Sequence, residues 1–221
     1  MKKIVAINAS PRKKWNTGAL IREAAKGAAS EGAQVKVIDL YALDHFTGCV
    51  SCFGCKLPGH EGKCVYKDGL LPVLEEIRAA DGLVIGTPNY LGDASAGFRA
   101  LYERLIFPYI TYKTEPRSYS SRKIPVLFIM TSNAPKEMYT PEFYGRVVSN
   151  YQQSLCTFVG PTKVLISADT LQVDDYDKYD WTMFDAEAKR IRHETVFPKE
   201  KQEAFALGAR MAAAPWNETT D

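Results

Sequence analysis

The chain has 221 residues, enough for one large domain or a domain with insertions. Apolar residues make up 46%, which is ample for one core, and the net charge of +2 is too small to indicate a nucleic-acid partner. Every apolar run is shorter than a membrane helix or a signal peptide requires. We therefore expect a soluble, cytoplasmic protein without a membrane partner, whose cysteines persist as thiols or ligands.

Short apolar runs alternate with segments of helical periodicity. The first run, 2–7, is uninterrupted, as in a strand buried on both faces of a sheet. In the first helical segment, Asn16 or Thr17 is the expected cap and Gly32 the expected stop, and Asp93 or Ser95 is the expected cap of the third. The expected strands are 2–7, 34–40, 82–88, 124–131 and 163–168, and the expected helices are about 17–31, 69–81, 94–105, 143–157 and 199–213.

This alternation predicts a parallel sheet with helices on both faces, a five-stranded doubly wound α/β domain with three layers, α/β/α. We expect residues 1–221 to form this single domain, with a cysteine-rich insertion at about 41–69 and a C-terminal extension at about 170–221. Two further stretches exceed the minimal unit. Segment 109–123 is basic and 173–198 is acidic, and both are aromatic, so their opposite charges would suit a dimer contact.

The loop after the first strand, NASPRKKWNTGAL, has the residue types of a phosphate site. It offers the hydroxyls of Ser10 and Thr17, the amide of Asn16 and the cation of Arg12, and it leads into a helix N-terminus, which attracts anions. It lacks the glycine patterns of dinucleotide and nucleoside-triphosphate loops. A single phosphate monoester fits best, and a polar helix cap with surface cations is the alternative.

The loop after the third strand belongs to the stretch GTPNYLGDASAGFRALYERL. Pro88 and Gly92 punctuate it, and Asn89, Tyr90 and Leu91 lie at its tip. A planar heterocycle needs N–H groups along its polar edge and an apolar or aromatic wall against its face, and this loop can supply both. The alternative is a tight turn that happens to contain a tyrosine.

These two loops, with a cysteine-rich segment between them, resemble the flavodoxin-like NADPH-dependent FMN reductases, and more closely their branch related to iron–sulfur flavoproteins. The resemblance covers roughly the first 135 residues. It implies a flavodoxin-like fold, bound FMN, NAD(P)H as co-substrate, and a homodimer or homotetramer with the flavin near the subunit interface. Trp15 departs from the family, which often has a small residue there.

The resemblance also implies, by position, which residues bind FMN. The phosphate would be held by Ser10, Arg12, Asn16 and Thr17. The isoalloxazine would be lined by Pro88, Asn89, Tyr90 and Leu91. The edge of the ring or the ribityl chain would meet Thr131, Ser132 and Asn133, which follow the fourth strand.

Four of the five cysteines lie close together, at Cys49, Cys52, Cys55 and Cys64. The first three have the Cys-x-x-Cys-x-x-Cys spacing of a ferredoxin run. Iron–sulfur flavoproteins carry such a triplet with a fourth cysteine, although the gap to Cys64 is longer here than their usual spacing. A [4Fe-4S] cluster on these four thiols is one interpretation and free or structural thiols are another, while zinc and a redox disulfide also stay open.

The function implied by the resemblance is an NAD(P)H-dependent flavin or quinone-type reductase that works by ping-pong hydride transfer through FMN to a small-molecule or protein acceptor. The hydride step needs no acid–base side chain, so no catalytic residue is predicted. The alternative is an iron–sulfur flavoprotein that passes electrons between the cluster, FMN and a ferredoxin-like partner. A third hypothesis is a non-catalytic scaffold that binds a phosphate-bearing ligand or a partner protein.

Overall fold

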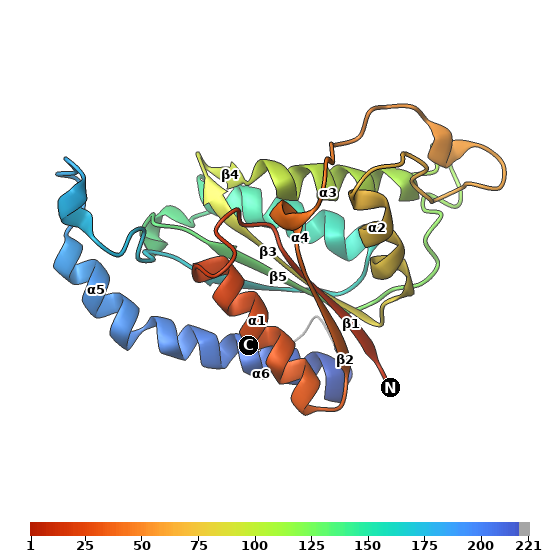
Figure 1. Ribbon diagram of the computed structural model, residues 1–221. Coiled ribbons are helices and arrows are strands. Elements are labelled where there is room, and N and C mark those ends of the chain that lie inside the picture. The colour runs from red at the N-terminus through yellow and green to blue at the C-terminus, as the bar shows by residue number, and fades with distance from the viewer. Residues whose placement is uncertain (217–221) are drawn as a thin grey trace.

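The computed structural model describes residues 1–216 and contains one central sheet. The parallel strands are β1 (Lys3–Asn8), β2 (Gln34–Asp39), β3 (Gly82–Tyr90), β5 (Val126–Thr131) and β6 (Thr162–Ser167). Their order is β2-β1-β3-β5-β6, and a short strand, β4 (Asp93–Ala94), pairs antiparallel with the end of β3 (Figure 1). This is the strand order of the flavodoxin-like doubly wound fold. The predicted fold class is therefore confirmed.

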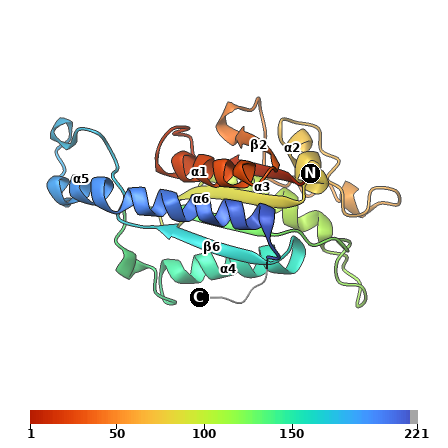
Figure 2. The same cartoon turned by 90° about the horizontal axis from the view of Figure 1, so that it is seen from below.

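Helices cover both faces of the sheet (Figure 2). One face carries α1 (Asn16–Ser30) and α6 (Phe197–Ala213), and the other carries α2 (Leu70–Ala79), α3 (Ala96–Ile106) and α4 (Tyr144–Phe158). A further helix, α5 (Ala186–Thr195), leads into α6 and extends past the sheet (Figure 1). Within residues 1–216, no helix combines the length and apolarity needed to cross a bilayer.

The central strands are buried on both faces, which explains their unbroken apolar runs. In β1, Ile4 and Ala6 pack into the core beneath α1 and α6, whereas Val5 and Ile7 pack into the core beneath α2 and α3. Alternate residues of β3 and β5 divide in the same way between the two cores. A strand whose side chains enter both cores has no polar face, so apolar and polar residues do not alternate along it.

Of the two expected helix caps, that of α3 is confirmed and that of α1 is wrong, and two elements were not expected. Ser95 caps α3 as expected, because its Oγ accepts a hydrogen bond from the N–H of Phe98. The cap of α1 is Trp15, and Asn16 and Thr17 form the first helical turn, so the expected cap was wrong. Strand β4 and helix α5 were not expected, since α5 reads AEAKRIRHET and offers too few apolar residues for a periodic signal. The division into one domain with an insertion and an extension stays a prediction, and residues 217–221 of that extension lie outside the described part.

Helices α1 and α6 meet at two glycines. A Cβ at Gly208 would lie 1.9 Å from the carbonyl oxygen of Ala24, and a Cβ at Gly27 would lie 1.9 Å from that of Phe205. Both obstacles are backbone atoms, which cannot move without moving their helix. The helices therefore touch backbone to backbone, and this contact fixes α1 on the sheet.

We predict that Gly208→Ala destabilises the protein. The free energy of unfolding should fall by about 1–3 kcal/mol because the added methyl overpacks the contact, even though alanine is the better helix former. Urea denaturation measures the change. Ala206→Leu, which adds bulk at an exposed position of the same helix, should stay within about 0.5 kcal/mol of wild type. An unchanged stability for Gly208→Ala would show that this contact is not tight.

Candidate functional site

A pocket of about 120 Å³ lies at the carboxyl edge of the sheet. Ten of the eleven side chains expected to bind FMN line it, namely Ser10, Arg12, Asn16, Thr17, Pro88, Asn89, Tyr90, Thr131, Ser132 and Asn133. The eleventh, Leu91, lies at the tip of the β3–β4 turn, where its side chain is fully exposed outside the pocket. Three loops that are far apart in the sequence therefore meet at one place.

The β1–α1 loop is held by its own polar groups. The side-chain oxygen of Asn8 accepts a hydrogen bond from the N–H of Ser10 (3.1 Å), and the Ser10 hydroxyl accepts one from the N–H of Arg12 (3.2 Å). A Cβ at Gly18 would lie 2.0 Å from the carbonyl oxygen of Lys13, so the loop folds tightly over the start of α1. The first N–H groups of a helix have no acceptor within it. The pocket therefore lies at a helix end that favours an anion.

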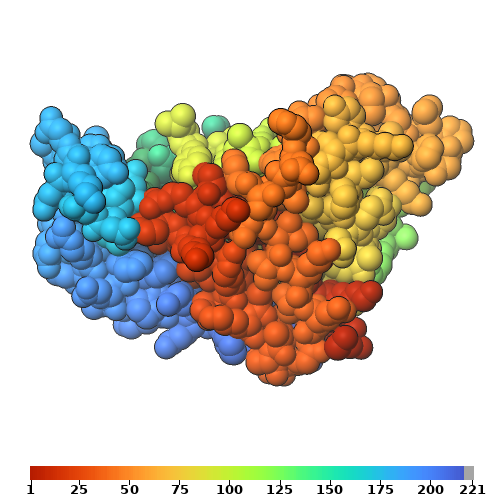
Figure 3. All heavy atoms as spheres, viewed as in Figure 1, coloured from red at the N-terminus to blue at the C-terminus, as the bar shows by residue number. Residues whose placement is uncertain are grey.

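The segment that follows β6 closes this loop from the other side. The carbonyl oxygen of Leu171 accepts hydrogen bonds from Asn16 Nδ2 (2.8 Å) and Trp15 Nε1 (3.0 Å), and that of Gln172 accepts one from Arg12 Nη1 (2.5 Å). The Arg12 guanidinium also stacks 3.9 Å above the Trp15 ring. In Figure 3 the β1–α1 loop (red) lies beside the segment around 173–185 (light blue). The bulky Trp15 thus ties the loop to this later segment.

Residues Thr170, Leu171 and Gln172 complete the pocket, and sequence reasoning missed them. Their contribution comes largely from backbone carbonyls, which carry no signature in the sequence. The only signal was the length of the chain after the fifth strand, which exceeds the minimal fold. At the pocket floor, Thr17 Oγ1 and Thr131 Oγ1 share a hydrogen bond of 2.7 Å, which links α1 to the end of β5.

Two amide oxygens of residues that line the pocket have no hydrogen-bond partner within residues 1–216. They are Asn133 Oδ1 and Gln172 Oε1, and both atoms are buried. A buried acceptor that stays unpaired costs about 1–3 kcal/mol. A ligand with N–H or O–H donors on its edge would relieve this cost. The ring edge and hydroxyl chain of a flavin are such donors, so the residues present fit the group that the resemblance implies.

The β3–β4 hairpin forms another wall. Leu91 and Gly92 both have positive φ (55° and 83°), as a two-residue hairpin turn requires. Asn89 Oδ1 accepts a hydrogen bond from the N–H of Gly92, and its Nδ2 donates to Tyr139 Oη (3.3 Å). Burial raises the pKa of Tyr139 and of Tyr90. Both phenols therefore stay protonated at neutral pH and can donate hydrogen bonds.

The four clustered cysteines line a second pocket, of about 20 Å³. Cys49 and Cys52 are exposed, Cys64 is partly exposed and Cys55 is buried. Burial raises the pKa of the Cys55 thiol, and the neighbouring Lys56 opposes that shift. Within residues 1–216, no group of three or more His, Cys, Asp or Glu side chains is arranged to hold a single metal ion. The fifth cysteine, Cys156, lies in α4 and is partly exposed.

The cysteine loop is anchored by Arg104, one of the most buried side chains of the protein. Its guanidinium pairs with the carboxylate of Asp68 and donates hydrogen bonds to the carbonyl oxygens of Thr47 (3.2 Å) and Tyr66 (2.8 Å) and to Cys64 Sγ (3.4 Å). Arg104 lies near the C-terminal end of α3. In Figure 1 the cysteine loop (orange) lies near the C-terminal end of α3, whereas the β3–β4 turn lies near the start of that helix.

Residues 2–147 match the family described as NADPH-dependent FMN reductase. This match covers well over half of the chain, which therefore belongs to that family. The predicted resemblance is confirmed.

Two curated relatives carry the name iron-sulfur flavoprotein. The one from Methanocaldococcus jannaschii is 37% identical over 102 residues, which are 46% of this chain and 51% of the relative. The one from Archaeoglobus fulgidus is 35% identical over 104 residues, 46% of this chain and 48% of the relative. The chain thus spans about half the length of the curated relatives it matches.

Solved structures share the fold at low identity. An NAD(P)H:quinone oxidoreductase from Methanothermobacter marburgensis is 13% identical with a TM-score of 0.64, over 95% of this chain and 98% of that one. An azoreductase from Bacillus anthracis is 12% identical with a TM-score of 0.65, over 95% of this chain and 100% of that one. These likenesses support the fold assignment alone.

We predict that Asp68→Asn destabilises the cysteine loop. Burial by itself would raise the pKa of the Asp68 carboxyl, but hydrogen bonds from Arg104 and from the N–H groups of Thr47 and Leu70 outweigh it, and the pKa is lowered. Removing the charge leaves the Arg104 guanidinium buried without its counterion, which should lower the free energy of unfolding at pH 7 by about 3–5 kcal/mol. Urea denaturation measures this loss, and Asp44→Asn, at an exposed position, is the matched control.

The loss should depend on pH. The folded-state pKa of Asp68 lies below its unfolded-state value, so its stabilisation is complete above the unfolded-state pKa and is lost as the pH falls through the folded-state pKa. Wild type and Asp68→Asn should therefore converge in stability in acid. A difference that stays constant as the pH falls through the acid range would contradict this assignment.

Proposed function

We propose that the chain is an FMN-binding oxidoreductase that takes electrons from NAD(P)H and passes them to a flavin- or quinone-type acceptor. The observation that carries this proposal is the meeting of three loops in one pocket at the N-terminus of α1, with two unpaired amide oxygens on residues that line it. Membership in the NADPH-dependent FMN reductase family supports the cofactor and the co-substrate. We also infer one cytoplasmic flavodoxin-like domain that assembles as a homodimer or homotetramer.

In this proposal FMN supplies the ring that accepts and donates hydride, and the chain binds and orients it. Ser10, Asn16 and Thr17 would bind the phosphate at the end of α1, and the exposed cation of Arg12 would complement its charge. Asn133 would accept a hydrogen bond from the ring or the ribityl chain.

The rest of the wall would fit the flat ring. Pro88, Asn89 and Tyr90 would lie along the isoalloxazine, with Thr131 and Ser132 at its edge. Leu91 would contact the isoalloxazine only from outside the pocket. Of the eleven expected residues, Leu91 therefore has the least support. The hydride step itself needs no acid–base side chain, so no catalytic residue is proposed.

A second candidate is an iron–sulfur flavoprotein with a ferredoxin-like partner. The observation that favours it is that Cys49, Cys52, Cys55 and Cys64 line one pocket, and the two curated relatives carry that name. A single zinc ion needs thiolates about 2.3 Å away, whereas a cubane spreads its cysteine ligands around a larger body. A cubane would therefore need the four thiols spread more widely than a single zinc ion would.

Absorption spectroscopy on protein purified without oxygen separates the two candidates, with iron and sulfide assays on the same sample. Flavin bands without iron would support the reductase and leave the cysteines as thiols. Flavin bands over a broad cluster absorption, with about four irons per chain, would support the iron–sulfur flavoprotein. A colourless protein that also fails to bind added FMN would overturn both.

We predict that Asn16→Asp weakens FMN binding about tenfold or more. The new carboxylate would stand in the pocket at the expected phosphate position and repel it, and tenfold corresponds to about 1.4 kcal/mol. Titration of the flavin-free protein with FMN, followed by flavin fluorescence, gives Kd. Asn150→Asp makes the same change at an exposed position of α4 and should leave Kd unchanged. Equal Kd values for both variants would remove Asn16 from the phosphate site.

A further inference from the structure

We propose that the chain beyond the family match takes part in the cofactor site, and that buried Lys189 of α5 is a positioning residue for the two unpaired amides of the pocket, those of Asn133 and Gln172. The family match ends at residue 147, whereas Lys189 and the segment 169–172 come later in the chain. This inference rests on the proposed binding of FMN. It adds residues that were not predicted from the sequence.

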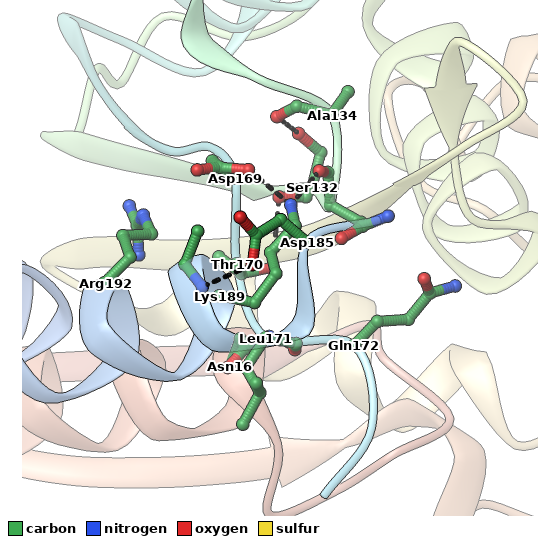
Figure 4. A network of polar contacts seen from close by, with 12 residues as sticks. Asn16, Ser132, Ala134, Asp169, Thr170, Leu171, Gln172, Asp185, Lys189 and Arg192 are labelled. Carbon is green, nitrogen blue, oxygen red and sulfur yellow. Dashed lines mark hydrogen bonds and ion pairs between the residues drawn. The ribbon is translucent and has the colours of Figure 1, made fainter. Parts of the chain in front are cut away.

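Lys189 joins three elements at one point. Its side chain is only 8% exposed, its Nζ donates a hydrogen bond to the carbonyl oxygen of Asn133 (2.8 Å), and it forms an ion pair with Asp169. Figure 4 shows the Lys189 side chain reaching from its helix toward Asp169 and the Ser132–Ala134 strand end. The ammonium thus connects α5 to the loops that follow β5 and β6.

Backbone hydrogen bonds hold the same two loops together. The N–H of Asp169 donates to the carbonyl oxygen of Ala134 (2.7 Å), and the N–H of Thr170 donates to that of Ser132 (2.9 Å). Asp169 has a positive φ of 55°, so the chain turns sharply at the residue that pairs with the lysine. This turn directs Thr170, Leu171 and Gln172 along the pocket wall.

Gln172 is fixed at its backbone while its side chain keeps a free acceptor. Its N–H donates to Tyr176 Oη (3.0 Å), and its carbonyl oxygen accepts from Arg12. Its Oε1 atom is buried without a partner in the described part of the chain, as is Oδ1 of Asn133, and both residues line the pocket. Two such acceptors suit a ligand with N–H or O–H donors. The Lys189–Asp169 pair fixes the positions of the two residues that carry them.

Only the lysine of this pair is buried, because the Asp169 side chain is 45% exposed. The pair is a weak source of stability, since the ammonium has lost its hydration while water screens its partner. The charge of Lys189 and its hydrogen bond to the Asn133 carbonyl oxygen therefore serve the pocket more than the stability of the fold. A positive charge beside a ligand that gains electrons favours the reduced form, and a negative charge opposes it.

The experiment uses Lys189→Met and Asp169→Asn, with Lys178→Met as the control at an exposed lysine nearby. For each, the Kd for FMN and the midpoint potential of the bound FMN are measured. Each test variant should raise Kd about tenfold, and the control should match wild type. Lys189→Met leaves the Asp169 carboxylate unpaired and should lower the potential, whereas Asp169→Asn leaves the ammonium unpaired and should raise it.

The outcomes separate the two proposals. A wild-type protein that does not bind FMN overturns the proposed function and, with it, the role of Lys189. Wild-type binding with unchanged Kd and potential in both variants overturns the role of Lys189 alone. If the midpoint potentials of both variants shift in the same direction, the ion pair is merely structural, and the proposed role of Lys189 is overturned.

If Lys189→Met does not fold, Gln172→Ala tests the same site. The Gln172 amide oxygen has no partner in residues 1–216, so its removal should leave the melting temperature near that of wild type while Kd for FMN rises. Gln153→Ala, at an exposed position of α4, is its control. An unchanged Kd for Gln172→Ala would overturn the inference that the segment after β6 contributes to the cofactor site.

Discussion

The parallel direction of the five long strands is the constraint from which the site follows. Parallel neighbours end at the same edge of a sheet, so the loops after β1, β3, β5 and β6 are brought together however far apart they lie in the sequence. Burial on both faces keeps the strands themselves apolar. Polar chemistry is thereby confined to this edge and to the segments inserted between the elements.

Two buried cations anchor the segments that exceed the minimal fold. Arg104 organises the cysteine loop, and Lys189 ties α5 to the ends of β5 and β6. Each has a carboxylate partner, and Arg104 also donates to two backbone carbonyl oxygens and Lys189 to one, which is how a buried charge is usually satisfied. The two anchors lie on different helices, α3 and α5. The cysteine pocket and the carboxyl-edge pocket are therefore built independently, each around its own ion pair.

Much of this was accessible from the sequence because it depends on side-chain type. Apolar runs predicted the five long strands, and the polar loop after the first strand, with Asn89 and Tyr90 at the end of β3, predicted most of the residues that line the pocket. The segment at Leu171 was not accessible, because it acts through backbone carbonyls that any residue could provide. Helix α5 was missed because it extends past the sheet and buries little beyond Lys189, so its polar sequence shows no helical period. Leu91 was expected to line the isoalloxazine because of its position in a motif. Its positive φ instead directs its side chain away from the pocket.

The near-continuous helical arm formed by α5 and α6 has a consequence for how the sequence can vary. Gly208 fixes the rotation of α6 against α1, and Lys189, which must meet Asn133, lies about two helical turns before α6 begins at Phe197. One residue inserted between them would turn Lys189 by about 100° around the helix axis and carry it away from the pocket. The loop at 173–185 has no such angular restriction. The chain should thus tolerate changes of length at 173–185 and resist them between Lys189 and Gly208.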